Sequence, residues 1–163
     1  MINIVEMVLM GILATFIMDI LAVVLSKLKI IKPLIGPEVV GRWFLYMFRG
    51  KFVHNDINRT PALNNEKLWA LIAHYLIGIA LAGIYLFSEV IVPGIRDQLY
   101  MPLVFGLATT VLPWFWLYPS IGIGFIASKT SNRSAYIRTS LINHTDFGLG
   151  LTLWVVVFRP LLQ

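Results

Sequence analysis

Apart from Glu6 near the start of the first stretch, four carboxylate or imidazole side chains lie in stretches of this sequence that are otherwise mostly apolar. Asp19 falls in the first stretch, His74 in the second, and His144 with Asp146 in the last. An ionisable group at the centre of a bilayer costs about 2.5 kcal/mol or more, so such residues usually mark a binding site or a proton path. Because successive membrane spans alternate in direction, we expect Asp19, His74 and His144 to lie at one depth, near one face of the membrane.

Small residues at helical spacing indicate which way these side chains point. Small side chains four residues apart let two helix backbones approach closely, so stripes of them normally form helix–helix interfaces. Each of the three polar residues belongs to such a stripe, and we therefore predict that all three point inward toward one another. The stripes are Gly11, Thr15 and Asp19; Ala70, His74, Gly78 and Ala82; and Ser140, His144, Gly148 and Thr152.

The side chains available limit the chemistry of such a cluster. The chain has no cysteine, which excludes thiolate metal sites and thiol nucleophiles. Imidazole and carboxylate groups suit a divalent transition metal or a proton relay. The predicted metal set is Asp19, His54, Glu66, His74 and His144, and the predicted ligand-binding set is Asp19, Arg42, His74, Arg138, His144 and Asp146.

Each candidate also has a structural interpretation, which the sequence leaves open. Asp19 would then fasten a neighbouring helix, and His74 and His144 would be satisfied core histidines. Arg42 and Arg138 would be charges that set the orientation in the membrane rather than groups that bind phosphate.

The elements that position these residues are predicted to be membrane helices. The 163 residues are 58% hydrophobic and 13% charged, with a mean hydropathy of +0.81, outside the range of soluble globular proteins. Since a helix needs about 20 apolar residues to cross a bilayer, we predict one all-α domain, 1–163, a bundle of four transmembrane helices. The spans are expected at about 4–25, 68–87, 101–127 and 139–158, with a break in the third at Pro113 and Pro119. An interfacial amphipathic helix at about 38–49, its apolar face toward the acyl chains, is expected between the first two.

The distribution of positive charge predicts the orientation. Eleven of the thirteen Lys and Arg residues fall between spans one and two or between spans three and four, and the other two are Arg96 and Arg159. Lys and Arg accumulate in cytoplasmic loops, so both termini are expected in the periplasm. No basic run with interleaved aromatic residues is present, so nucleic-acid binding is not expected.

Many short segments together resemble a family of small bacterial membrane proteins, the domain-of-unknown-function family 2938. The resemblance implies a polytopic protein of the bacterial inner membrane and implies no activity. The segments are Ala14-Thr15, Met18-Asp19, Gly41-Arg42-Trp43, Arg49-Gly50-Lys51-Phe52, His54, Glu66, His74-Tyr75, Gly78, Pro119, Gly122, Gly124, Ala127-Ser128-Lys129-Thr130, Arg138, Ser140-Leu141, His144 and Phe147-Gly148-Leu149-Gly150-Leu151.

Three functional classes remain after these observations. The first is a protein that binds or transports an ion, a proton or a small ligand through the Asp/His cluster, with membrane lipid around it and a homo-oligomer as the expected assembly. The second is a membrane-embedded enzyme acting on a lipid or quinone headgroup, with a histidine as general acid–base. The third is a structural subunit of a larger membrane complex.

Overall fold

A computed structural model describes residues 3–95 and 98–162, and the described chain is helical. Within these residues, four helical stretches are long and apolar enough to cross a membrane: Ile4–Lys27, Glu66–Ile91, Met101–Ser120 and Arg133–Leu161. The predicted all-α architecture with four spans is therefore confirmed. Arg96, which was used in the charge count, lies outside the described residues.

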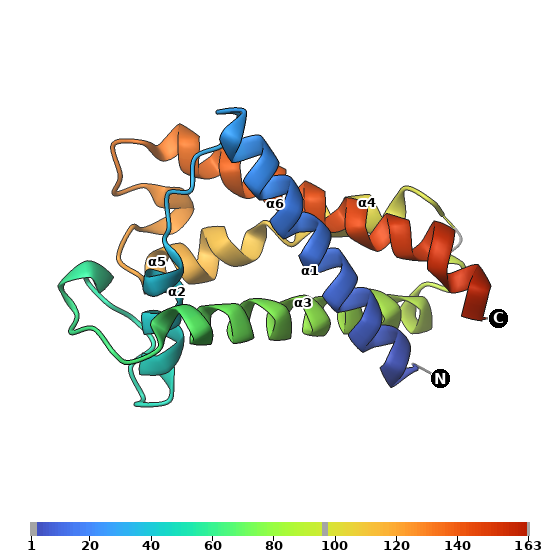
Figure 1. The fold of residues 1–163 in the computed structure, drawn as a ribbon, viewed down its shortest axis with the longest axis horizontal. Coiled ribbons are helices and arrows are strands. Elements are labelled where there is room, and N and C mark those ends of the chain that lie inside the picture. The colour runs from blue at the N-terminus through green and yellow to red at the C-terminus, as the bar shows by residue number, and fades with distance from the viewer. Residues whose placement is uncertain (1–2, 96–97, 163) are drawn as a thin grey trace.

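The first helix, α1 (Ile4–Lys27), packs against both α3 (Glu66–Ile91) and α6 (Arg133–Leu153), and α4 (Met101–Ala108) packs against α6. Figure 1 shows α1 crossing the bundle obliquely, with both termini at the end opposite α2. The end away from the termini carries α2 (Pro37–Met47), the start of α3 and the start of α6, and it is called the α2 end below.

Small residues make these helix contacts possible, as the stripes predict. A Cβ added at Gly78 of α3 would overlap Thr15 Oγ1 on α1, and one added at Gly106 of α4 would overlap the backbone of Gly148 on α6. At Gly106 no side chain fits without moving a helix, whereas at Gly78 the obstacle is the side chain of Thr15. The close approach brings the polar residues of α1 and α3 within reach of each other.

The break in the third span begins before Pro113. The α-helix of α4 ends at Ala108, a π-helical segment covers Pro113–Leu117, and α5 (Tyr118–Ser120) completes the span. Because proline lacks an N–H and its ring crowds the carbonyl four residues earlier, the ladder fails near Thr109. The carbonyl of Thr109 accepts from Leu112 N at 3.0 Å instead, and the hydroxyl of Thr109 donates to Gly106 O at 2.6 Å.

The span was predicted to end at about residue 127, but it ends at Ser120. Gly122, Gly124, Ile126 and Ala127 all have positive φ angles, which a continuing helix cannot contain. Residues 121–127 therefore form a turn toward α6. The fourth span starts earlier than predicted, at Arg133, and finishes with a π-helical segment, Trp154–Phe158.

The predicted short helix between the first two spans is α2, but its apolar face packs against protein. Trp43 is only 2% exposed and clusters with Ile57 and Ile121. The loop after α2 is ordered rather than free, because His54 N donates to Ser120 O at 2.7 Å and Ile57 N to Ile121 O at 3.1 Å. A short 3-10 helix, Ile57–Arg59, is held in this way against the end of the third span.

Candidate functional site

Asp19 and His74 form the pair that their spacing predicts. His74 Nε2 lies 2.9 Å from Asp19 Oδ1, and the Tyr75 hydroxyl donates to Asp19 Oδ2 at 3.3 Å. A carboxylate only accepts hydrogen bonds, so Nε2 of His74 carries the proton. The two side chains are 37% and 41% exposed, which places the pair at the edge of the bundle rather than in its core.

His144 is held by a different partner, the Thr109 hydroxyl at the break in the third span. Its Nδ1 lies 2.7 Å from Thr109 Oγ1. The single hydroxyl proton of Thr109 is donated to Gly106 O, so Nδ1 of His144 must carry the proton that joins the two side chains. In the neutral imidazole, Nε2 is then a hydrogen-bond acceptor.

Two adjoining cavities lie between the spans, and both histidines line both of them. An apolar cavity of about 190 Å³ is walled by side chains such as Ile77, Leu81 and Phe147. A second cavity, of about 330 Å³, is also lined mostly by apolar side chains, but it includes Tyr136, Thr139, Ser140 and Asn143 in its wall and is called the polar cavity below. The two share six lining residues: Met18, Val40, His74, Pro113, Leu117 and His144.

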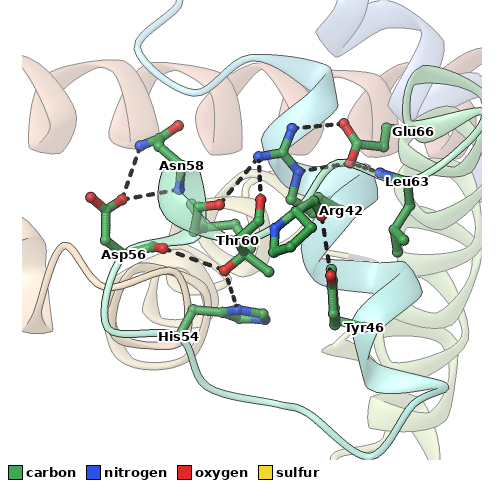
Figure 2. A network of polar contacts seen from close by, with 10 residues as sticks. Arg42, Tyr46, His54, Asp56, Asn58, Thr60, Leu63 and Glu66 are labelled. Atoms are coloured by element: carbon green, nitrogen blue, oxygen red, sulfur yellow. Dashed lines mark hydrogen bonds and ion pairs between the residues drawn. The ribbon is translucent and has the colours of Figure 1, made fainter.

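Arg42 and Glu66 form an ion pair at the α2 end (Figure 2). Arg42 Nε lies 2.7 Å from Glu66 Oε1 and Nη2 lies 3.0 Å from Oε2, while Nη1 donates to the carbonyls of Ile57 and Thr60. Glu66 also accepts from Leu63 N at 2.7 Å. The hydrogen bond with Glu66 raises the pKa of the Arg42 guanidinium, so this cation joins α2, the loop and α3, and it does not line either cavity.

His54 belongs to the same network and not to the cavities. It is 2% exposed, its Nδ1 lies 3.0 Å from Thr60 Oγ1, and its Nε2 is buried without a partner among the described residues. Burial lowers the pKa of the imidazole, and the nearby Lys51 lowers it further. Asp56 accepts from Asn58 N at 3.0 Å and so begins the 3-10 helix. Figure 2 shows that His54 and Asp56 come from the loop that closes over Arg42.

The predicted metal set is thus divided among three places. Asp19 and His74 form one pair, His144 bonds Thr109, and His54 and Glu66 belong to the network around Arg42. Across residues 3–95 and 98–162, no group of three or more His, Cys, Asp or Glu side chains could hold a metal ion.

The comparisons with known proteins agree with the resemblance seen in the sequence. The model of a family described as a protein of unknown function, DUF2938, matches residues 8–158. The chain belongs to this family. No curated protein and no solved structure matches it.

Two of the predicted ligand-binding residues lie apart from the cavities of this DUF2938 protein. Arg138 is exposed on α6. Asp146 is 6% exposed, and its Oδ2 has no hydrogen-bond partner in the described chain. Neither residue lines a cavity next to His144.

Sequence reasoning missed Thr109 and Asn143, which both bear on His144 or on its cavity in the DUF2938 protein. Thr109-Thr110 is a polar pair in an apolar span, four residues before Pro113. Hydroxyl groups commonly satisfy backbone carbonyls where a proline interrupts a membrane helix. A threonine pair shortly before a proline is therefore a usable signal. Asn143 gave no signal besides its place next to His144.

Proposed function

We propose that this protein binds a small amphiphilic molecule from the membrane in the two joined cavities. The observation that carries the proposal is that His74 and His144, from different spans, both line both cavities. Ligand sites are typically apolar hollows with a few convergent polar groups. Two imidazoles at the junction of an apolar and a polar cavity match that description.

The geometry supports a ligand with two chemically different ends. The apolar cavity, of about 190 Å³, has room for a small hydrocarbon group, since an apolar cavity of about 150 Å³ binds benzene. The polar cavity places hydroxyl and amide groups of α6 beside it. A ligand that reaches from one cavity into the other passes between His74 and His144.

The charge distribution supports a cytoplasmic location for this site. Both basic connections meet at the α2 end, and the polar cavity is lined by Ser26 near the end of α1 and by Tyr136 near the start of α6. Under the positive-inside rule this end faces the cytoplasm of an inner membrane. Because the chain has no cysteine, single-cysteine variants Ser134→Cys and Leu99→Cys test the orientation, and only Leu99→Cys should react with an impermeant maleimide from the periplasm.

A second candidate is an enzyme acting on a lipid or quinone headgroup, and the Asp19–His74 pair favours it. A carboxylate that holds an imidazole nitrogen fixes its tautomer and leaves the other nitrogen, Nδ1, able to take a proton. Under this hypothesis, Asp19→Asn lowers turnover of a bound headgroup but leaves binding intact. Under the binding proposal no headgroup is converted, so Asp19→Asn does not change the amount of converted ligand.

The binding proposal is tested by photo-crosslinking in lipid nanodiscs. The probes are four dodecyl chains with a mid-chain diazirine, ending in an alcohol, a methyl ether, a carboxylate or a trimethylammonium group. At least one probe should label peptides that line the cavities, from α3 and α6 together. Labelling confined to outward-facing residues such as Phe16, which is 50% exposed, would contradict the proposal.

Matched variants on α2 make the crosslinking specific. Val40 lines both cavities, so Val40→Trp should fill the space where they meet and abolish cavity labelling. Leu45 lies on another face of α2 and lines neither cavity, so Leu45→Trp should leave labelling unchanged. Equal labelling of both variants would show that the probes bind elsewhere.

A further inference from the structure

We infer that the ligand's head is uncharged and donates hydrogen bonds from hydroxyl groups to the protein. This inference rests on the proposed function, and it specifies which chemical class the cavities accept. Three observations carry it: the absence of charged side chains in the cavity walls, the acceptor atoms that the walls present, and the concentration of hydroxyl and amide side chains in the wall of one cavity.

No Lys, Arg, Asp or Glu of the described chain lines either cavity. A phosphate or carboxylate head would therefore be removed from water without a cation to pair with it, which is strongly unfavourable. Arg42, one of the two arginines predicted to bind phosphate, is bound to Glu66 through two nitrogens. An anionic lipid headgroup does not fit this lining, and an uncharged head does.

The wall of the polar cavity presents acceptor atoms beside the hydroxyl groups of residues such as Tyr136 and Ser140. Nε2 of His144 is an acceptor, because Nδ1 carries the proton that it donates to Thr109. Asn143 Oδ1 is buried and has no hydrogen-bond partner within the described residues. A ligand hydroxyl can donate to an imidazole nitrogen and can also pair with a wall hydroxyl, whereas an ether oxygen can only accept, so a hydroxylated head makes more hydrogen bonds with this wall than its ether does.

A third acceptor follows from the Asp19–His74 pair. With Nε2–H of His74 donated to Asp19, Nδ1 of the neutral ring has an unshared electron pair. The walls around the polar cavity thus combine two imidazole acceptors with Asn143. Ser140 in the same wall is only 5% exposed and can donate back to a ligand hydroxyl oxygen.

Two kinds of membrane molecule share this chemistry. One is a quinol, an aromatic ring with two hydroxyls on an alkyl chain, and the other is a monoacylglycerol, whose glycerol head has two free hydroxyls. In both, the head would occupy the polar cavity and the chain would extend into the apolar cavity. The inference concerns the shared feature, a neutral hydroxylated head.

The test compares matched pairs that differ only in their donors. Binding of decyl hydroquinone and of its dimethyl ether is measured by the melting temperature of the protein in micelles, and 1-monodecanoylglycerol is compared with its dimethyl ether in the same way. For at least one pair, the hydroxyl compound should bind about tenfold more tightly, the value of one or two hydrogen bonds. The pair that shows the preference identifies the ligand as quinol-like or glycerolipid-like.

Variants of α6 locate the effect. Asn143→Leu has a similar size but no acceptor, so it should reduce the hydroxyl preference to about threefold or less. Thr152→Ala removes a hydroxyl that bonds Gly148 O outside both cavities, and it should leave the preference unchanged. If Asn143→Leu does not fold, the comparison of matched pairs on the natural protein still decides the matter.

The failure of this inference and the failure of the proposed function give different results. Equal binding of hydroxyl and ether compounds, with cavity labelling still observed, would overturn the hydroxyl-donor head and leave a ligand site. Preference for the carboxylate or trimethylammonium probe would overturn the uncharged head. If none of the four photoprobes labels the cavities, the binding proposal itself is wrong.

Discussion

Replacing one member of the Arg42–Glu66 pair should be far more damaging than replacing both. The two side chains are 14% and 7% exposed, so Arg42→Met leaves the Glu66 carboxylate buried without its cation. Breaking a buried ion pair in this way costs about 3–5 kcal/mol, whereas an apolar replacement of both partners is often nearly neutral. We expect Arg42→Met to lower the free energy of unfolding by about 3 kcal/mol.

The double variant Arg42→Met/Glu66→Leu tests the reasoning. It should recover all but about 1–2 kcal/mol, which reflects the hydrogen bonds that it still lacks, from Leu63 N to Glu66 and from Arg42 to the carbonyls of Ile57 and Thr60. The assay is unfolding by SDS in dodecylmaltoside micelles, followed by tryptophan fluorescence, to which the docked Trp43 contributes. Lys67→Met, which removes the exposed ion pair with Glu38, is the control and should cause no measurable change.

Additive effects of the two single changes would refute this account of the pair. They would mean that Arg42 and Glu66 act independently. Arg42 would then be available for another role, such as the phosphate binding that the sequence left open. Arg42→Lys should behave as a partial loss, because a lysine cannot make the two-nitrogen contact with a carboxylate.

Three further changes have expected outcomes in the same unfolding assay. Gly78→Ala should destabilise the protein by about 1–3 kcal/mol through overpacking against Thr15, and adding Thr15→Ala should restore much of that loss; no recovery would show that the overlap lies elsewhere. Burial lowers the pKa of His54. As the pH falls below the ordinary histidine pKa of about 6.5, the unfolded chain therefore binds more protons than the folded chain. The free energy of unfolding should decline below that pH, and the decline should be smaller in His54→Gln. Asp146→Asn should not lower stability, since Oδ2 of this buried carboxylate has no partner in the described chain and an amide costs less to bury; a large loss would reveal an ion pair or a bound cation.

The spans and their interfaces could be predicted because both depend on local sequence. Length and hydropathy set the positions of the helices, and small residues at four-residue spacing determine where backbones can meet. The Thr15–Gly78 contact and the Asp19–His74 pair follow from these two rules. The exact ends of the third span did not, because the turn after Ser120 depends on backbone conformations, such as the positive φ angles of Ile126 and Ala127, that side-chain patterns do not reveal.

The contacts of the connecting segments were not predictable in the same way. Arg42 and Glu66 lie 24 residues apart in α2 and α3, and no local rule joins them. The apolar face of α2 was interpreted as facing lipid, since a protein surface and an acyl-chain region favour the same residues. His144 was expected beside Asp19 and instead bonds Thr109, because the break before Pro113 places a hydroxyl next to it. That arrangement depends on the packing of α4 on α6 and not on either sequence alone.

Native mass spectrometry of the protein released from nanodiscs tests the central claim, that the joined cavities bind one amphiphile per chain. The account predicts one neutral adduct of lipid or quinol mass on the natural protein and on Leu45→Trp, and none on Val40→Trp. An adduct that persists in Val40→Trp, or a natural protein that carries none in a membrane extract containing both quinols and glycerolipids, would contradict it.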